Sequence, residues 1–252
     1  MAHNLIQCQI LVQKAVRAAS DYIASSSTES LFLVRPVHES DFVLGLQKEA
    51  RLAKLPINVG IHEPAQGGEK VKNTLIWIDE SGKITQKYQK LHLFDVDIKG
   101  GPVLKESRNV EKGTKIVPPF ETPVGRLGLS ICFDLRFPEV SLALRRQGAE
   151  IITYPSAFTV PTGQAHWETL LRARAIETQS YIVAAAQCGP HNPKRFSYGH
   201  SLIVNPWGEV VAKLGGEYEE PEIAVADIDF DLLTKVRTEM PLLRRTDVYP
   251  EV

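Results

Sequence analysis

The sequence has few cysteines, almost no net charge and no long hydrophobic run. Its three cysteines, Cys8, Cys132 and Cys188, are too scattered for a disulfide framework, which indicates a reducing compartment. A formal net charge of −1 gives no electrostatic attraction to nucleic acid or to an anionic membrane. No apolar run approaches the roughly 20 residues of a membrane span, and a signal-peptide pattern is missing. These absences predict a cytoplasmic protein, with a mitochondrial location as the open alternative.

What the sequence does contain is typical of one globular α/β domain. Hydrophobic residues make up 43% of the 252 residues and charged residues 23%. Strand-like and helix-like segments alternate, with interspersed hairpin turns and no linker, so we expect one domain over residues 1–252 with a mixed sheet. The predicted helices are residues 5–19, 41–54, 139–147, 166–180 and 227–239. The predicted strands are residues 57–62, 74–79, 84–88, 127–132, 151–154, 181–187, 201–205 and 210–213.

Cys132 stands at the most informative point of the chain. The predicted strand 127–132 ends at this cysteine, and Pro138 and Glu139 suit the first turn of the helix that follows. A thiol at such a strand-to-helix turn faces backbone N–H groups, which can stabilise an oxyanion. The alternative is a buried core cysteine, the ordinary role of a lone cysteine in an apolar run.

Two further residues become candidates for a functional site only in combination with Cys132. Lys90 follows the second strand of a predicted hairpin, and Glu106 lies in a loop-rich region; either one alone reads as a surface charge. Together, and in this order, the segments around them resemble the carbon–nitrogen hydrolase (nitrilase) superfamily. The resemblance covers about residues 56–250. It rests on residues 88–97, 104–107, 128–139, 154–158, 163–178 and 198–208.

This resemblance implies a nitrilase-type α-β-β-α sandwich and an amidase mechanism. Cys132 is implied as the nucleophile that forms a thioester, Lys90 as the cation that stabilises the oxyanion together with the Cys132 or Phe133 N–H, and Glu106 as the group that orients the lysine or water. Arg136 is implied to pair with a substrate carboxylate. The resemblance also implies substrate contacts from Phe137, Phe158 and Thr162.

Within the superfamily, residues 154–158, 165–168 and 171–179 are most similar to the amidases that hydrolyse deaminated glutathione. The ω-amidases, which act on α-keto acid amides, are close neighbours. The resemblance implies a small-molecule amide substrate, no cofactor, no metal, no nucleic acid or membrane partner, and a homodimer formed near the Cys132 turn and helix 166–180. A zinc site at Cys188, His191 and His200 matches no zinc-ligand spacing. A papain-like hydrolase would need its own motif around the cysteine, which is absent.

One family feature is missing from the sequence. The superfamily has an early strand that ends in a Pro-Glu pair, whose glutamate is the general base. In this chain helix 5–19 leads directly to Ser20-Asp21, and the first Pro-Glu pair is Pro138-Glu139. The resemblance therefore implies an N-terminally incomplete domain without early strands. Glu39 is a possible substitute base, although Ser40 or Asp41 reads better as a helix cap. The rival to an amidase is a catalytically dead relative that binds a ligand or a partner protein.

Overall fold

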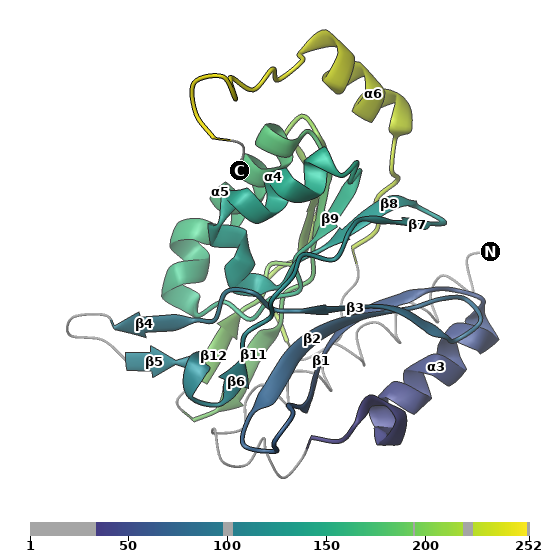
Figure 1. Cartoon of the computed structure of the whole chain (residues 1–252), viewed down its shortest axis with the longest axis vertical. Coiled ribbons are helices and arrows are strands. Elements are labelled where there is room, and N and C mark those ends of the chain that lie inside the picture. Colours follow the sequence, from purple (N-terminus) through teal and green to yellow (C-terminus); the bar gives the residue numbers. More distant parts are fainter. Residues whose placement is uncertain (1–33, 98–102, 194, 219–223, 251–252) are drawn as a thin grey trace.

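The computed structural model describes residues 34–97, 103–193, 195–218 and 224–250, and it shows the predicted layered α/β fold (Figure 1). The helical elements are η1 Val37–Glu39, α3 Asp41–Ala53, η2 Glu106–Arg108, η3 Cys132–Arg136, α4 Pro138–Arg146, α5 Val160–Thr178 and α6 Phe230–Glu239. The strands are β1 Ile57–Pro64, β2 Val71–Ile78, β3 Ile84–Gln89, β4 Asp95–Asp97, β5 Val103–Lys105, β6 Val110–Glu111, β7 Phe120–Thr122, β8 Gly125–Leu129, β9 Ile151–Thr153, β10 Tyr181–Ala184, β11 Cys188–Asn192, β12 Arg195–Tyr198, β13 Leu202–Val204 and β14 Val210–Lys213.

Two sheets form the centre of the described part of the chain. The first has the order β1-β2-β3, with β6 paired to β2, and its β1-β2-β3 pairs are antiparallel. The second has the order β14-β13-β10-β9-β8-β7 and is parallel across β8, β9 and β10. It is antiparallel at both edges, which is the mixed sheet that the alternating pattern predicts.

The alternation of side chains along β2 shows why the sheets stack. Ile76 and Ile78 point toward α3, where they pack with Val43 and Leu46. Leu75 and Trp77, on the opposite face, belong to a second cluster, which the other sheet completes with residues such as Leu129 and Ile151. Because successive side chains of a strand face opposite sides, β2 is buried on both faces, between α3 and the second sheet.

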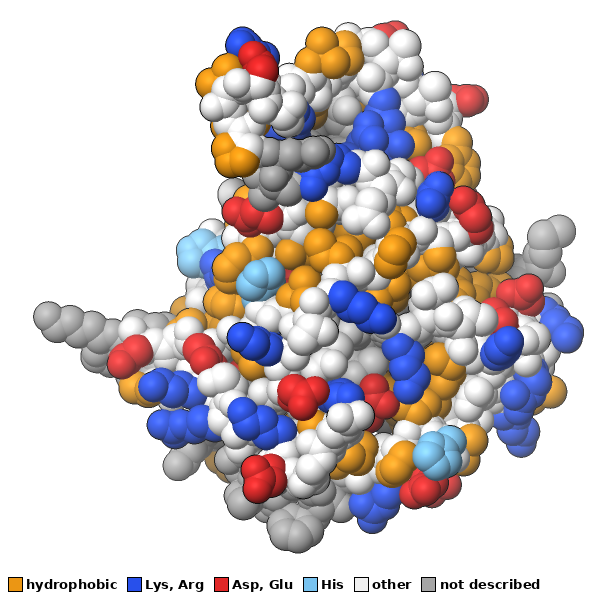
Figure 2. All heavy atoms as spheres, viewed as in Figure 1, with side chains coloured by type: hydrophobic (Ala, Val, Ile, Leu, Met, Phe, Trp, Pro, Cys, Tyr) orange, Lys and Arg blue, Asp and Glu red, His pale blue; other side chains and the backbone are white. Residues whose placement is uncertain are grey.

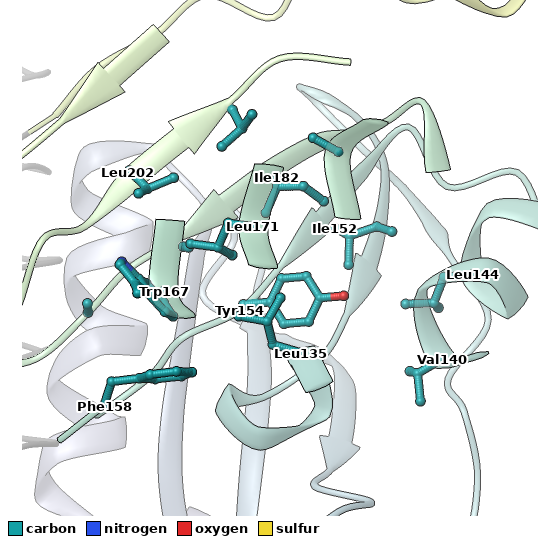
Figure 3. Packing of buried hydrophobic residues seen from close by; sticks show 14 of the residues in the cluster. Leu135, Val140, Leu144, Ile152, Tyr154, Phe158, Trp167, Leu171, Ile182 and Leu202 are labelled. Carbon is teal, nitrogen blue, oxygen red and sulfur yellow. The ribbon is translucent and has the colours of Figure 1, made fainter. Parts of the chain in front are cut away.

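The second sheet is covered on its outer face by α4 and α5. Trp167 and Leu171 of α5 pack there against Ile182, and Leu144 of α4 belongs to the same cluster (Figure 3). The order of layers is therefore α3, first sheet, second sheet, and α4 with α5. This is the expected α-β-β-α sandwich, held by three apolar clusters that each join two layers.

The structure corrects several predicted boundaries. Helix α5 begins at Val160, six residues before the predicted start, because Pro161 suits a first helical turn and does not break the helix. The predicted loop before Tyr198 instead contains the antiparallel pair of β11 and β12. The predicted strand 127–132 ends at Leu129, and it could not have included Cys132, whose left-handed φ of 44° does not fit a strand.

The prediction of a missing early strand lies outside the described residues, as do the predicted helix 5–19 and Cys8. At the start of the described part, Ser40 caps α3 by accepting from the Val43 N–H at 3.4 Å, as predicted. Glu39 contacts His38 at 3.2 Å in η1, and its side chain is 58% exposed. η1 packs through Val37 with α3 in the outer layer, so the substitute base considered at Glu39 lies on an exposed part of that layer.

On the visible face of the molecule, neither positive nor negative side chains dominate the surface (Figure 2). Figure 2 shows basic and acidic side chains interspersed over its lower part, with hydrophobic side chains gathered across the middle. None of the helices in the described ranges combines the length and the apolar character that crossing a membrane requires.

Candidate functional site

Cys132 lies at the turn between β8 and η3, in a backbone conformation that is costly for a residue with a side chain. Its φ of 44° is in the left-handed region, where a Cβ meets the backbone. The turn is held because the Cys132 N–H donates to the Pro155 carbonyl at 3.0 Å, beyond the end of β9. The thiol is free and half-buried. Such strain at a strand-to-helix turn is characteristic of functional positions.

Lys90 and Glu106 form a buried ion pair. The Lys90 Nζ lies 2.6 Å from the Glu106 Oε2, and their side chains are 4% and 17% exposed. The same carboxylate accepts the Phe94 N–H at 2.6 Å and the Asn73 side-chain amide at 3.3 Å. The ammonium is therefore held in one place by a carboxylate that is itself fixed. In the sequence, Lys90 and Glu106 are 16 positions apart and each resembles an ordinary surface charge. In the structure they bind each other in the interior.

His62 and Arg195 also face this region, and sequence reasoning missed both. Loss of hydration on burial lowers the pKa of His62 to about 4; Glu106 opposes this shift, and Lys90 and Arg195 add to it. Burial likewise lowers the pKa of Arg195, while the nearby Cys132 and Glu106 act in the opposite direction. Arg195 is thus within electrostatic reach of both groups. His62 lies on β1 and Arg195 on β12, and no motif in the sequence distinguishes either of them as a functional residue.

Asp134, two residues after the cysteine, is fully buried and accepts four hydrogen bonds. Its Oδ2 accepts from the Tyr88 hydroxyl at 2.6 Å and from the Ile131 N–H at 3.0 Å. Its Oδ1 accepts from the His92 N–H at 3.0 Å and contacts the His92 Nδ1 at 2.9 Å. Burial, followed by the charge of Asp134, raises the pKa of Tyr88. Every donor therefore belongs either to the residues around Lys90 or to the strand end before Cys132.

Arg136 closes η3 on the more exposed side of the site. Its guanidinium lies 5.8 Å from the ring centre of Phe133 and 5.6 Å from that of Phe158, and its Nη2 donates to the His166 Nδ1 at 3.2 Å. Burial lowers the pKa of Arg136, and Cys132 opposes the shift. The aromatic rings and the imidazole orient the guanidinium without neutralising its charge.

The structure places the other predicted substrate contacts in supporting positions. Phe137 stacks on His92 with ring centres 3.6 Å apart, and Phe158 is 7% exposed and packs on Trp167. The Thr162 hydroxyl is bonded to the Thr159 hydroxyl at 2.8 Å in the first turn of α5. Of these three residues, Phe158 also contacts the Arg136 guanidinium.

The described residues hold no group of three or more His, Cys, Asp or Glu side chains that could bind a metal ion. The Cys188 thiol donates to the Gly216 carbonyl at 2.8 Å, and His191 contacts the Ser197 hydroxyl. His200 contacts the Tyr198 carbonyl at 2.8 Å through its Nδ1. The three residues considered for zinc therefore each have a local partner.

Comparison with known proteins decides the family. A sequence model described as Carbon-nitrogen hydrolase matches residues 1–238. The chain belongs to the carbon–nitrogen hydrolase family. Over 259 aligned residues it is 46% identical to a Schizosaccharomyces pombe protein described as a probable hydrolase nit2, with 99% of this chain and 94% of that protein covered.

Two further family members extend the likeness. The chain is 43% identical over 261 residues to the deaminated glutathione amidase of Mus musculus, covering 98% of this chain and 80% of that enzyme. The crystal structure of the Caenorhabditis elegans NitFhit protein superposes with a TM-score of 0.79 at 46% identity, covering 84% of this chain and 52% of that chain. The sandwich fold is thus that of the carbon–nitrogen hydrolases.

Proposed function

We propose that this protein is an amidase that hydrolyses the amide of deaminated glutathione or of a related α-keto acid amide. The observation that carries the proposal is the buried Lys90–Glu106 pair, which lies with the strained Cys132 turn in one electrostatic environment. The likeness to an amidase of that name supports the substrate. An ω-amidase activity is the near alternative, since it uses the same chemistry on a smaller α-keto acid amide.

In the proposed reaction, the Cys132 sulfur attacks the amide carbonyl and the carbonyl oxygen becomes an oxyanion. Lys90 stabilises this negative charge, and a fixed cation of this kind contributes about a hundredfold or more in rate. The Cys132 N–H is already bonded to Pro155, so the Phe133 N–H is the backbone donor that remains for the oxyanion. The C–N bond then breaks, the amine takes a proton and leaves, and water hydrolyses the thioester.

The substrate proposal depends on Arg136. Deaminated glutathione carries two carboxylates, and a guanidinium can bind a carboxylate with two parallel hydrogen bonds. Arg136 lies within electrostatic reach of Cys132 and is only half-buried, so a substrate can reach it. Phe133 and Phe158 fix the plane of the guanidinium for this contact.

The missing Pro-Glu segment bears on the rate. Without a glutamate at that place in the sequence, we expect slow loss of the Cys132 proton and therefore slow turnover. The same feature is the reason to consider a second candidate, a catalytically dead family member that binds a ligand or a partner, which the likeness to named hydrolases and amidases does not favour. The two candidates differ in whether any hydrolysis depends on Cys132.

The deciding experiment measures hydrolysis of deaminated glutathione by the purified protein and by Cys132→Ala. We expect slow release of the oxo-acid and the amine by the unmodified protein and none by Cys132→Ala. Cys188→Ala is the matched control, because this second thiol is bonded to the Gly216 carbonyl, and it should retain the activity. Binding of the amide with no hydrolysis would establish the second candidate.

We further propose a homodimer that buries α5. Ile176 is 45% exposed and Trp207 is 55% exposed, and Gly208 brings the Trp207 turn directly against Ile176. Exposed apolar side chains on adjoining segments are typical of an interface. Light scattering after size exclusion should show twice the chain mass, and Ile176→Glu should give the monomer. A monomeric unmodified protein at micromolar concentration contradicts this proposal.

A further inference from the structure

Asp134 is a buried carboxylate to which the reaction outlined above assigns no part. It is 0% exposed, and its four hydrogen bonds come from two separate segments of the chain. Burying a carboxylate is costly unless hydrogen bonds replace its water. Four hydrogen bonds to one carboxylate meet that requirement, and together they hold the Asp134 side chain in one position.

The donors surround the two reactive residues. Tyr88 and His92 stand two residues before and two residues after Lys90, and both bind the carboxylate. Ile131, directly before Cys132, gives its N–H to the same group. One side chain therefore joins the segment that carries the cation to the turn that carries the nucleophile.

Two ring contacts also join these segments, since Phe137 stacks on His92 and Phe94 packs edge-on against Phe133. The backbone hydrogen bonds of Lys90 and Cys132 lead elsewhere. The Lys90 N–H donates to the Asn73 carbonyl at 2.9 Å, which ties Lys90 to β2 of the first sheet. The Cys132 N–H donates to Pro155, which ties the turn to the second sheet. Among the side-chain hydrogen bonds of the described residues, those of Asp134 bridge the Lys90 segment and the Cys132 turn.

We propose that Asp134 is a positioning residue that sets the place of the Lys90 ammonium relative to the Cys132 sulfur. The inference rests on the proposed amidase function, in which this distance decides how well the oxyanion is stabilised. Misplacing a catalytic group by about 1 Å can lower a rate by roughly a hundredfold. Asp134 acts through its neighbours and needs no contact with the substrate.

Asp134→Asn tests the proposal because it keeps the shape and changes the bonding. An amide nitrogen cannot accept a hydrogen bond, so the Ile131 N–H or the His92 N–H loses its acceptor. We expect kcat to fall about a hundredfold while KM changes less than about threefold. Tyr88→Phe removes one donor, keeps the charge, and should lower kcat by a smaller factor. Gln179→Ala is the control, because it removes buried hydrogen bonds to α6 at Val236 and Met240 and should leave kcat unchanged.

A second readout needs no substrate and so separates this proposal from the amidase proposal. The rate of iodoacetamide labelling at Cys132 is measured by peptide mass spectrometry at pH 7. If Asp134 were only a nearby negative charge, Asp134→Asn would label faster, because removing that charge favours the thiolate. Loss of positioning predicts slower labelling, about tenfold, since Lys90 no longer supports the thiolate. Should Asp134→Asn fail to fold, Tyr88→Phe is measured instead: because it keeps the carboxylate charge, a role as a nearby charge alone predicts unchanged labelling, and loss of positioning predicts slower labelling. Labelling at or above the unmodified rate in the folded variants overturns the proposal.

Discussion

The two flanks of Cys132 differ in their exposure to water. On one side, the side chains of Lys90 and Glu106 are 4% and 17% exposed and bind each other at 2.6 Å. On the other side, Arg136 is half-buried, and its partner His166 is exposed. A buried cation interacts strongly with a developing charge, whereas an exposed cation can meet an incoming ligand. On this difference we base the proposal that the first flank carries the chemistry and the second recognises the substrate.

The largest expected effect concerns the missing base. Inserting Phe-Leu-Pro-Glu-Ala between Ala19 and Ser20 should raise kcat by about a hundredfold to ten-thousandfold, because a positioned general base contributes this much. We expect the same insertion to raise the melting temperature as well, because the family resemblance implies a further strand at this point of the sequence. An insertion with Gln in place of Glu is the control: it should stabilise the protein without raising kcat. Equal rates for the two insertions would exclude the base role.

Lys90→Met should lower kcat by about a hundredfold or more, because the oxyanion loses its cation. It also leaves the Glu106 carboxylate buried without its partner, which destabilises the fold. The double variant Lys90→Met with Glu106→Gln should regain stability while remaining inactive. Lys87→Met is the matched control on β3, the strand that ends just before Lys90, since Lys87 binds Glu63 at 3.2 Å with its side chain 45% exposed. A similar loss of kcat in Lys87→Met would remove the distinction between the two lysines.

The low pKa of His62, about 4, predicts a dependence of stability on pH. Between pH 6.5 and 4 the unfolded chain binds a proton at His62 that the folded protein does not, so stability falls as the pH falls through this range. Over this range the free energy of unfolding should fall by on the order of 3 kcal/mol. Urea unfolding at several pH values should show a shallower decline for His62→Gln. His38→Gln, which changes an exposed histidine, is the control and should decline as steeply as the unmodified protein. The prediction would be contradicted if His62→Gln declined that steeply too.

Arg136→Lys should have a smaller effect, confined to recognition. We expect KM for an amide that bears a carboxylate to rise roughly tenfold, because an ammonium cannot form the paired hydrogen bonds of a guanidinium. For a neutral amide, KM should stay nearly the same. Steady-state kinetics with both amides measures this. An equal rise for the two amides would make Arg136 a structural residue.

The sequence predicts the succession of elements better than it predicts the site. Alternating strands and helices follow from side-chain periodicity, whereas the sandwich architecture and the grouping of Lys90, Glu106 and Cys132 are what the family resemblance implies. The roles of Asp134 and His62 could not be predicted, because both depend on segments that meet only in three dimensions. Of these two residues, only Asp134 could have been noticed in the sequence, because it stands two residues after Cys132.

The most direct test of the account is the detection of a thioester on Cys132. The protein is mixed with deaminated glutathione, quenched with acid during a single turnover, digested, and analysed by mass spectrometry. The account predicts the oxo-acyl group on the Cys132 peptide, in a smaller amount for Lys90→Met and absent in Cys132→Ala. An acyl group on Cys8 or Cys188, or hydrolysis that continues in Cys132→Ala, would contradict it.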